Sequence, residues 1–192
     1  MTILFIHGLA SSGAYKMASS LRILLKGSTV LAPDVPIEPS EALSLLEGIC
    51  SDESPDLVVG LSLGGFWAQK LRGMKKILVN PDLHPSKLLR SKIGKMDYLS
   101  PRRDGKTSFE ITESICHVYE TLEMSEFDGL DAEETALTTG FFADHDEMVD
   151  CFDEFCIHYP GRGFRYPGTH LPNFPQIKNY FLPVILDEVS SE

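Results

Sequence analysis

The hydrophobic positions of this chain alternate between short continuous apolar runs and longer stretches with helical spacing. Runs of the first kind are typical of strands buried on both faces of a sheet, and they occupy residues 3–6, 29–32, 57–59, 76–79, 135–142 and 163–166. Between them, apolar residues recur every three or four positions, as on one side of an amphipathic helix. This alternation predicts the α/β class: a mainly parallel, six-stranded sheet with helices on both faces, in three layers.

The alternation is interrupted over residues 84–129. No apolar run in this stretch predicts a strand, whereas Ile111, Ile115 and Val118 have the spacing of a helix. An excursion of this length between sheet elements is typical of a cap or lid. We therefore expect a short helical cap inserted into a single domain spanning residues 1–192.

A serine bracketed by glycines directly follows the third predicted strand. Gly60, Ser62 and Gly64 form a G-x-S-x-G pattern, which in a strand-turn-helix context is the nucleophile elbow of serine hydrolases. Glycine is needed at both positions because a side chain there would collide with the neighbouring strand or helix. The pattern arises by chance in roughly 0.06 of chains of this length. Its strand-turn-helix context therefore carries more weight than the motif itself.

Candidate partners for the serine follow in the order that hydrolases use. His170 comes after the last predicted strand, from where a general base can reach the carboxyl edge of the sheet. Asp146 is the preferred acid because an apolar pair follows it closely and can begin the next helix, which places it at a strand-to-helix corner. Asp144 and Asp82 remain alternatives. The single histidine between Asp144 and Asp146 is too weak a pattern to predict a metal site, and none is expected.

A second group of site residues follows the first predicted strand. Gly8 allows the backbone to approach a substrate closely, and the N–H of Leu9 is expected to bind the oxyanion together with the N–H of Leu63. His7 is expected to pack and hydrogen-bond beneath this loop rather than to take part in catalysis. The elbow and this loop would then face the same edge of the sheet.

Charge and composition argue against several classes of partner. The net charge of −11 argues against nucleic acid and against an anionic membrane surface. No apolar run approaches the length of a membrane span, and the start of the chain has no basic region with a cleavage site, so a cytoplasmic location is expected.

Four cysteines without a CxxC pair are expected to be buried free thiols on helices: Cys50, Cys116, Cys151 and Cys156. Pro183 predicts a kink or break in the last helical stretch.

Several longer segments resemble a known family. The segments are ILFIHGLASS at 3–12, DLVVGLSLGGFWAQKL at 56–71, KILVNPDLHPSKLL at 76–89, YLSPRRDGKTSFEI at 98–111 and YPGTHLPNFPQIKNYFLPVI at 166–185. They are similar to the small bacterial YqiA-type esterases of the α/β-hydrolase superfamily. The resemblance implies a compact hydrolase that lacks the first two strands of the larger fold, with Ser62, Asp146 and His170 as its triad.

These observations predict a cofactor-free carboxylic ester hydrolase that forms an acyl-enzyme on Ser62. The short cap favours small or short-chain acyl esters as substrates. An acyl thioesterase with the same triad is the first alternative. A hydrolase-like protein that binds a small molecule without turnover is the second.

Overall fold

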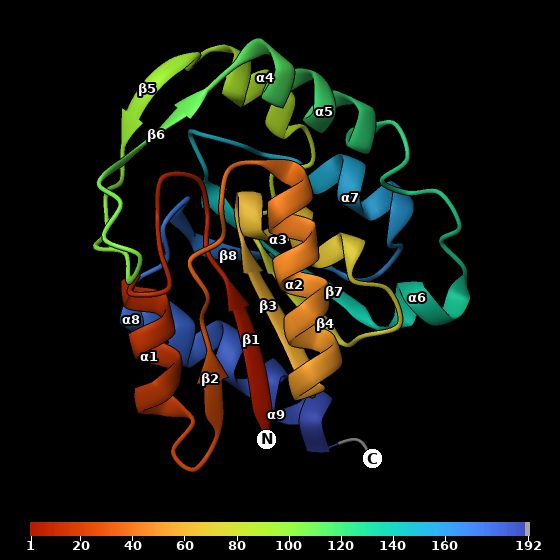
Figure 1. Ribbon diagram of the computed structural model, residues 1–192. Coiled ribbons are helices and arrows are strands. Elements are labelled where there is room, and N and C mark those ends of the chain that lie inside the picture. Colours follow the sequence, from red (N-terminus) through yellow and green to blue (C-terminus); the bar gives the residue numbers. More distant parts are fainter. Residues whose placement is uncertain (191–192) are drawn as a thin grey trace.

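The computed structural model describes residues 1–190 and contains a parallel six-stranded sheet in the order β2-β1-β3-β4-β7-β8 (Figure 1). The strands are β1 (Thr2–Ile6), β2 (Thr29–Leu31), β3 (Leu57–Leu61), β4 (Lys76–Val79), β7 (Thr138–His145) and β8 (Gly163–Thr169). Each pairs with its neighbours in parallel. The predicted six-stranded α/β architecture is confirmed.

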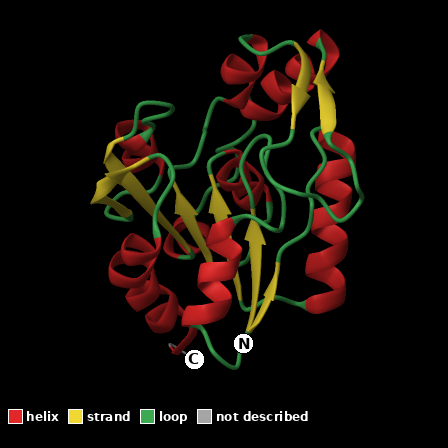
Figure 2. Cartoon of the chain, turned by 90° about the vertical axis from the view of Figure 1, so that its left-hand side faces the viewer, coloured by secondary structure: helices red, strands yellow, loops and turns green. Residues whose placement is uncertain are grey.

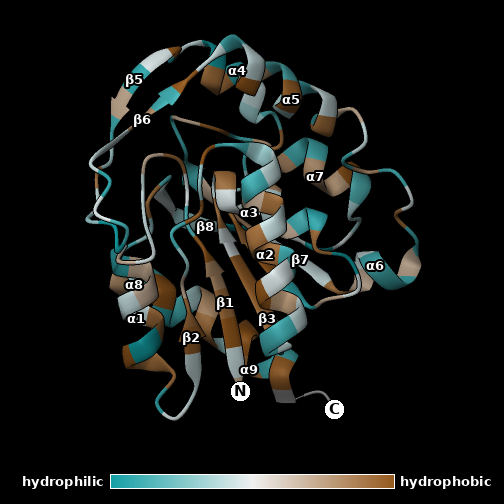
Figure 3. Ribbon diagram, viewed as in Figure 1, coloured by the Kyte–Doolittle hydropathy of each residue, from teal (hydrophilic) through white to brown (hydrophobic). Residues whose placement is uncertain are grey.

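Both faces of the sheet are buried beneath helices. Along β1, Ile3 and Phe5 belong to one hydrophobic cluster and Leu4 and Ile6 to another, because successive side chains of a strand point to opposite faces. The first cluster is completed by α1 (Lys16–Leu24), η1 (Ile177–Phe181) and α9 (Leu182–Ser190), and the second by α2 (Pro39–Glu53), α3 (Leu63–Lys70) and α7 (Phe152–His158). Figure 3 shows the apolar strands between these two layers.

The last helical stretch is irregular next to Pro183, as predicted. The short helix α8 (Phe174–Gln176) runs into η1, which is a π-helical turn, and α9 begins directly after it. Proline has no N–H to donate to the preceding turn, so regular α-helical bonding cannot run straight through this point. No helix within residues 1–190 combines the length and apolar character needed to cross a membrane.

The helices and strands of residues 84–129 lie over the carboxyl ends of the main strands, at the top of Figure 1. Helices α4 (Pro85–Arg90) and α5 (Glu113–Glu123) agree with the prediction of a helical cap. The prediction that this stretch contains no strand is wrong, because β5 (Gly94–Asp97) and β6 (Ser108–Ile111) form an antiparallel pair apart from the main sheet (Figure 2). Along β5, half-buried and exposed residues alternate, so this strand contains no apolar run from which it could be predicted.

Two element boundaries after the cap differ from the predicted ones. The strand predicted to begin at residue 135 begins at Thr138, since the preceding residues form α6 (Ala132–Ala136), which Asp131 caps by accepting a hydrogen bond from the Glu134 N–H. Strand β8 extends three residues further than predicted, to Thr169. This extension brings the strand to the residue directly before His170.

The cysteines are free thiols, but they are less deeply buried than predicted. Only Cys116 is fully buried, whereas Cys50, Cys151 and Cys156 are half-buried. Cys151 also lies just before α7 rather than within a helix, because that helix begins at Phe152. Met148 lies in the loop that follows β7.

Candidate active site

Ser62 stands at a sharp turn between β3 and α3. Its φ of 55° and ψ of −121° lie in a region that residues other than glycine rarely adopt. Such a conformation costs on the order of 1–3 kcal/mol, and the surrounding backbone holds it in place. The Ser62 N–H donates to the Val79 carbonyl at 3.0 Å, and the Ser62 carbonyl accepts from the N–H groups of Gly65 at 2.7 Å and Asp82 at 3.2 Å.

The glycines of the elbow are required by close packing of backbone against backbone. A Cβ atom on Gly60 would lie 2.4 Å from the Gly64 carbonyl oxygen, and one on Gly64 would lie 2.1 Å from the Ile6 carbonyl oxygen. A Cβ on Gly8 would lie 3.1 Å from the Cβ of Ser62. The elbow and the loop after β1 are therefore pressed together at the carboxyl edge of the sheet.

His170 and Asp146 form a buried hydrogen-bonded pair. The Nδ1 of His170 lies 2.8 Å from Oδ2 of Asp146, and the two side chains are only 6% and 2% exposed. Asp146 Oδ1 accepts the N–H groups of Met148 at 2.9 Å and Val149 at 3.0 Å. Burial alone would raise the pKa of Asp146, but the hydrogen bonds from His170, Val149 and Met148 outweigh it and hold the pKa below its usual value. Asp146 is thus an anion that binds the Nδ1 edge of the imidazole and fixes its orientation.

The two alternative aspartates occupy different surroundings. Asp144 is exposed near the end of β7, and within residues 1–190 the only carboxylate bonded to His170 is that of Asp146. Asp82 is 2% exposed; its Oδ1 accepts the His84 N–H at 3.1 Å and its Oδ2 has no partner among the described residues. Burial raises the pKa of Asp82 to about 6. Among residues 1–190, no group of His, Cys, Asp and Glu side chains is arranged to hold a metal ion.

Ser62 and His170 line the same cavity, which has a volume of about 400 Å³. No hydrogen bond joins them within residues 1–190, and such bonds often tighten only when substrate is bound. Residues of the cap, among them Leu88, Met96 and Leu99, form the opposite wall. The cavity therefore lies between the elbow and the cap.

Of the predicted oxyanion donors, Leu9 lines this cavity, and Leu9 and Leu63 together line a smaller cavity at the same edge of the sheet. Leu63 is the first residue of α3, and Leu9 follows β1; both line cavities at this edge, and neither N–H has a partner among the described residues. The N-terminal end of a helix favours negative charge. The two N–H groups are thus available to an oxygen atom placed beside Ser62.

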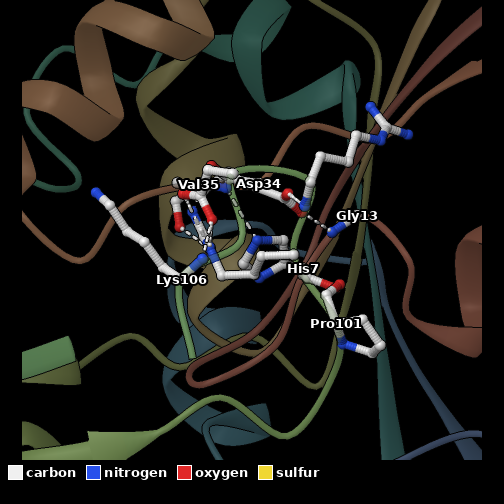
Figure 4. Close-up of polar contacts among 10 residues, drawn as sticks. His7, Gly13, Asp34, Val35, Pro101 and Lys106 are labelled. Atoms are coloured by element: carbon white, nitrogen blue, oxygen red, sulfur yellow. Dashed lines mark hydrogen bonds and ion pairs between the residues drawn. The ribbon is translucent and has the colours of Figure 1, made fainter. Parts of the chain in front are cut away.

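His7 braces the loop that carries Leu9. Its Nδ1 donates to the Gly8 carbonyl at 2.8 Å, and its Nε2 accepts the Val35 N–H at 3.0 Å, an arrangement that requires the neutral ring (Figure 4). Burial lowers the pKa of His7 to about 4, which keeps the ring neutral. The Gly8 carbonyl and the Leu9 N–H belong to one planar peptide and point in opposite directions. Fixing the carbonyl therefore orients the N–H.

Asp34 and Arg102 extend this brace to the cap, and neither was among the predicted site residues. The Arg102 side chain is 2% exposed and donates to the carbonyls of Asp34 at 3.1 Å and Val35 at 3.3 Å. The Asp34 carboxylate accepts the N–H groups of Gly13 at 2.7 Å and Arg103 at 2.6 Å (Figure 4). A sequence signal for Asp34 was its place in a proline-flanked loop after β2.

Asn80 holds the backbone of the loop that carries His170, whereas Asp146 binds the His170 ring. It has a positive φ of 44° at the end of β4. Its Nδ2 donates to the His170 carbonyl at 2.7 Å and to the Tyr166 hydroxyl at 2.9 Å, while its Oδ1 accepts the Ala143 N–H at 2.8 Å. One amide side chain thereby ties three strand ends together behind the His170–Asp146 pair.

Comparison with known sequences identifies one family. The profile described as "Uncharacterised protein family (UPF0227)" matches residues 2–157, in agreement with the resemblance found in the sequence. A UPF0227 protein of Shewanella woodyi (strain ATCC 51908 / MS32) is 28% identical over 108 residues, which are 51% of this chain and 60% of that protein. The UPF0227 protein Shewana3_2292 of Shewanella sp. (strain ANA-3) is 45% identical over 47 residues, 23% and 26% of the two chains. The alignments thus span less than two thirds of these relatives.

Solved structures share the fold at low sequence identity. The monoacylglycerol lipase of Paleococcus ferrophilus has a TM-score of 0.68 at 13% identity, over 100% of this chain and 95% of that one. The methylesterase MES16 of Arabidopsis has a TM-score of 0.64 at 12% identity, over 97% and 99%. The esterase domain of a Rhodothermus marinus protein has a TM-score of 0.60 at 18% identity, over 96% and 84%. The shared architecture is the α/β-hydrolase fold.

Proposed function

This chain belongs to the UPF0227 family, and from that premise and its α/β-hydrolase fold we propose that it is a carboxylic ester hydrolase with Ser62 as nucleophile. One observation supports the proposal above all others. The buried hydrogen bond between His170 and Asp146 lies at the cavity where the strained Ser62 stands. A serine becomes nucleophilic when a base takes its proton and a third group holds that base in place.

In the proposed reaction, Ser62 Oγ attacks the acyl carbonyl carbon while Nε2 of His170 takes the hydroxyl proton. Asp146 keeps the Nδ1–H of His170 directed toward itself and stabilises the imidazolium that forms. The N–H groups of Leu9 and Leu63 bind the oxyanion, and each such donor typically contributes about 2.7–4 kcal/mol. His170 then gives the proton to the departing alcohol.

Hydrolysis of the acyl-enzyme repeats these steps with water as nucleophile. His170 takes a proton from the water, the same two N–H groups bind the second oxyanion, and Ser62 leaves with the returned proton. This scheme needs no cofactor. The modest cavity of about 400 Å³, with its many apolar lining residues, supports small or short-chain acyl groups as substrates.

The test uses Ser62→Ala with 4-nitrophenyl butyrate as substrate. We expect the turnover to fall by about 10⁴-fold or more, because the nucleophile is lost while binding and the oxyanion donors remain. A fluorophosphonate probe should label the wild-type protein and not the variant. Ser19→Ala, which changes an exposed serine of α1, is the matched control and should keep wild-type turnover and labelling.

Two results would overturn the proposal. Wild-type turnover in Ser62→Ala would remove the serine from the reaction, and a wild-type protein that is neither labelled nor active would favour the binding-protein alternative. Acyl-thioesters of the same acyl length, measured beside the aryl esters, separate an esterase from a thioesterase. In either enzyme the loss in Ser62→Ala should be the same.

A further inference from the structure

We propose that the cavity beside Ser62 contains a subsite for an anionic oxygen group of the substrate, formed by Ser11, Tyr15, Lys16 and Lys92. The inference rests on the proposed hydrolase function and names its substrate class. The preferred substrate is an ester with an apolar part and a carboxylate, sulfonate or phosphate group at some distance from the scissile bond. The reasons are the charge, the free hydroxyls and the apolar walls of this cavity.

The charge of the cavity is opposite to that of the molecule. The chain has 28 acidic and 17 basic residues, yet the only residues with a full charge that line this cavity are Lys16 and Lys92. Neither lysine has an ion-pair partner within residues 1–190; Lys16 Nζ lies 5.9 Å from the centre of the Tyr15 ring. Among the described lysines only Lys76 forms an ion pair, with Glu134, so the feature that distinguishes Lys16 and Lys92 is their place at the cavity. Two unpaired cations at an apolar cavity attract an anionic ligand.

Two hydroxyl groups of the same wall lack protein partners. Ser11 is 8% exposed, and its Oγ and the hydroxyl oxygen of Tyr15 are buried without a hydrogen bond among the described residues. Both residues line the cavity. Burial raises the pKa of Tyr15, so its hydroxyl keeps its proton and remains a donor. A serine hydroxyl changes direction by rotation of one side-chain torsion, which gives a ligand oxygen a second donor here.

The two cations approach from different parts of the fold. Lys16 is the first residue of α1, a helix that packs on the main sheet, and Lys92 follows α4 in the cap. Figure 1 shows the descending loop of the cap meeting the start of α1, and the Leu99 N–H donates to the Ala10 carbonyl at this junction. The apolar walls between them include Met96 and Leu99. An amphiphilic ester therefore finds apolar contacts and positive charge in one cavity.

The anion could belong to the acyl part or to the alcohol part of the ester, and two substrate pairs distinguish these sources. For the acyl part, 4-nitrophenyl hydrogen glutarate is compared with 4-nitrophenyl hexanoate, its neutral analogue of similar size. For the alcohol part, 3-carboxyphenyl butyrate is compared with 3-acetylphenyl butyrate. The quantity measured is the ratio of kcat/KM for the anionic ester to kcat/KM for the neutral one.

For the wild-type protein at low salt, we expect kcat/KM for the anionic ester to exceed kcat/KM for the neutral ester by about fivefold or more in at least one pair. The double variant Lys16→Gln/Lys92→Gln should lower this ratio about tenfold, Ser11→Ala should lower it two- to threefold, and 0.5 M NaCl should lower the wild-type ratio because salt screens the lysines. Lys26→Gln, which removes an exposed lysine outside the cavity, is the matched control and should leave the ratio unchanged.

The subsite is refuted if the wild-type ratio is about one or lower in both pairs, or if the double variant and Lys26→Gln give the same ratio. All these exposed lysine variants should unfold at the wild-type temperature, which excludes misfolding as a cause. The two proposals fail in different ways. If Ser62→Ala hydrolyses these esters as fast as the wild type, the hydrolase function fails; if turnover depends on Ser62 but the ratio does not depend on the lysines, only the subsite fails.

Discussion

Replacing Gly64 by alanine should separate the elbow from the end of β1. The new methyl carbon would lie 2.1 Å from the Ile6 carbonyl oxygen and 2.8 Å from that of His7, whereas real Cβ atoms essentially never come closer than 3.0 Å to another atom. The backbone at one side of this contact must therefore move by roughly 1 Å. No flexible side chain is available to yield in its place, because both contacted atoms are backbone.

The magnitude follows from this geometry. Overpacking a well-packed interior typically costs about 1–3 kcal/mol, and a clash between backbone segments belongs at the upper end of that range. For a chain of this size each kcal/mol lowers Tm by about 2–4 °C, so Gly64→Ala should lower Tm by about 6–12 °C. The displaced carbonyls directly precede Gly8 and Leu9, so kcat for 4-nitrophenyl butyrate should fall more strongly than KM rises.

Thermal unfolding followed by circular dichroism and steady-state ester hydrolysis test the two parts of this prediction. Gly48→Ala is the matched control: a Cβ there meets no atom within 4 Å, and the position lies inside α2. Alanine should stabilise that helix by about 0.5–1 kcal/mol and leave kcat unchanged. If Gly64→Ala keeps both the Tm and the kcat of the wild type, the close approach of β1 and α3 is not the reason for a glycine in the elbow.

Two further predictions concern the aspartates. Asp146→Asn should lower kcat by about 10⁴-fold because His170 loses the partner that fixes its tautomer, while Asp144→Asn should stay near the wild-type rate; equal losses in the two variants would contradict this assignment. Asp82 has a folded-state pKa raised by burial from 3.8 to about 6, so folding takes up a proton and stability falls as the pH rises through that window. At pH 7.5, Asp82→Asn should therefore have a free energy of unfolding up to about 3 kcal/mol larger than the wild type, and so a higher Tm. Below pH 4 this difference should disappear. An identical Tm difference at both pH values would show that Asp82 does not titrate in this way.

The central strands could be predicted because they are buried on both faces. Each of β1, β3 and β4 contains a continuous apolar run, which is typical of a strand buried on both faces of a sheet. The pair β5 and β6 could not be predicted in the same way. These strands are short and partly exposed. Each depends on its pairing with the other and on the rest of the cap, and neither is marked by a local apolar run.

The site shows the same division between local and distant causes. The turn that carries Ser62 could be predicted from six consecutive residues, and the places of Asp146 and His170 from the strands that they follow. The roles of Asn80 and Arg102 could not be predicted, because their hydrogen bonds reach residues 63 to 90 and 67 to 68 positions away in the chain. Only the folded chain brings such groups together.

The contacts of Arg102 also determine which parts of this protein can be exchanged. The cap is bonded through Arg102 to the carbonyls of residues 34 and 35, and the Val35 N–H is bonded to His7, whose ring fixes the peptide before Leu9. A chimera that takes its cap from a relative must therefore carry residues 33–36 with it. For recombination and for protein engineering, the cap and the loop after β2 form one transferable module, although more than 60 residues separate them in the sequence.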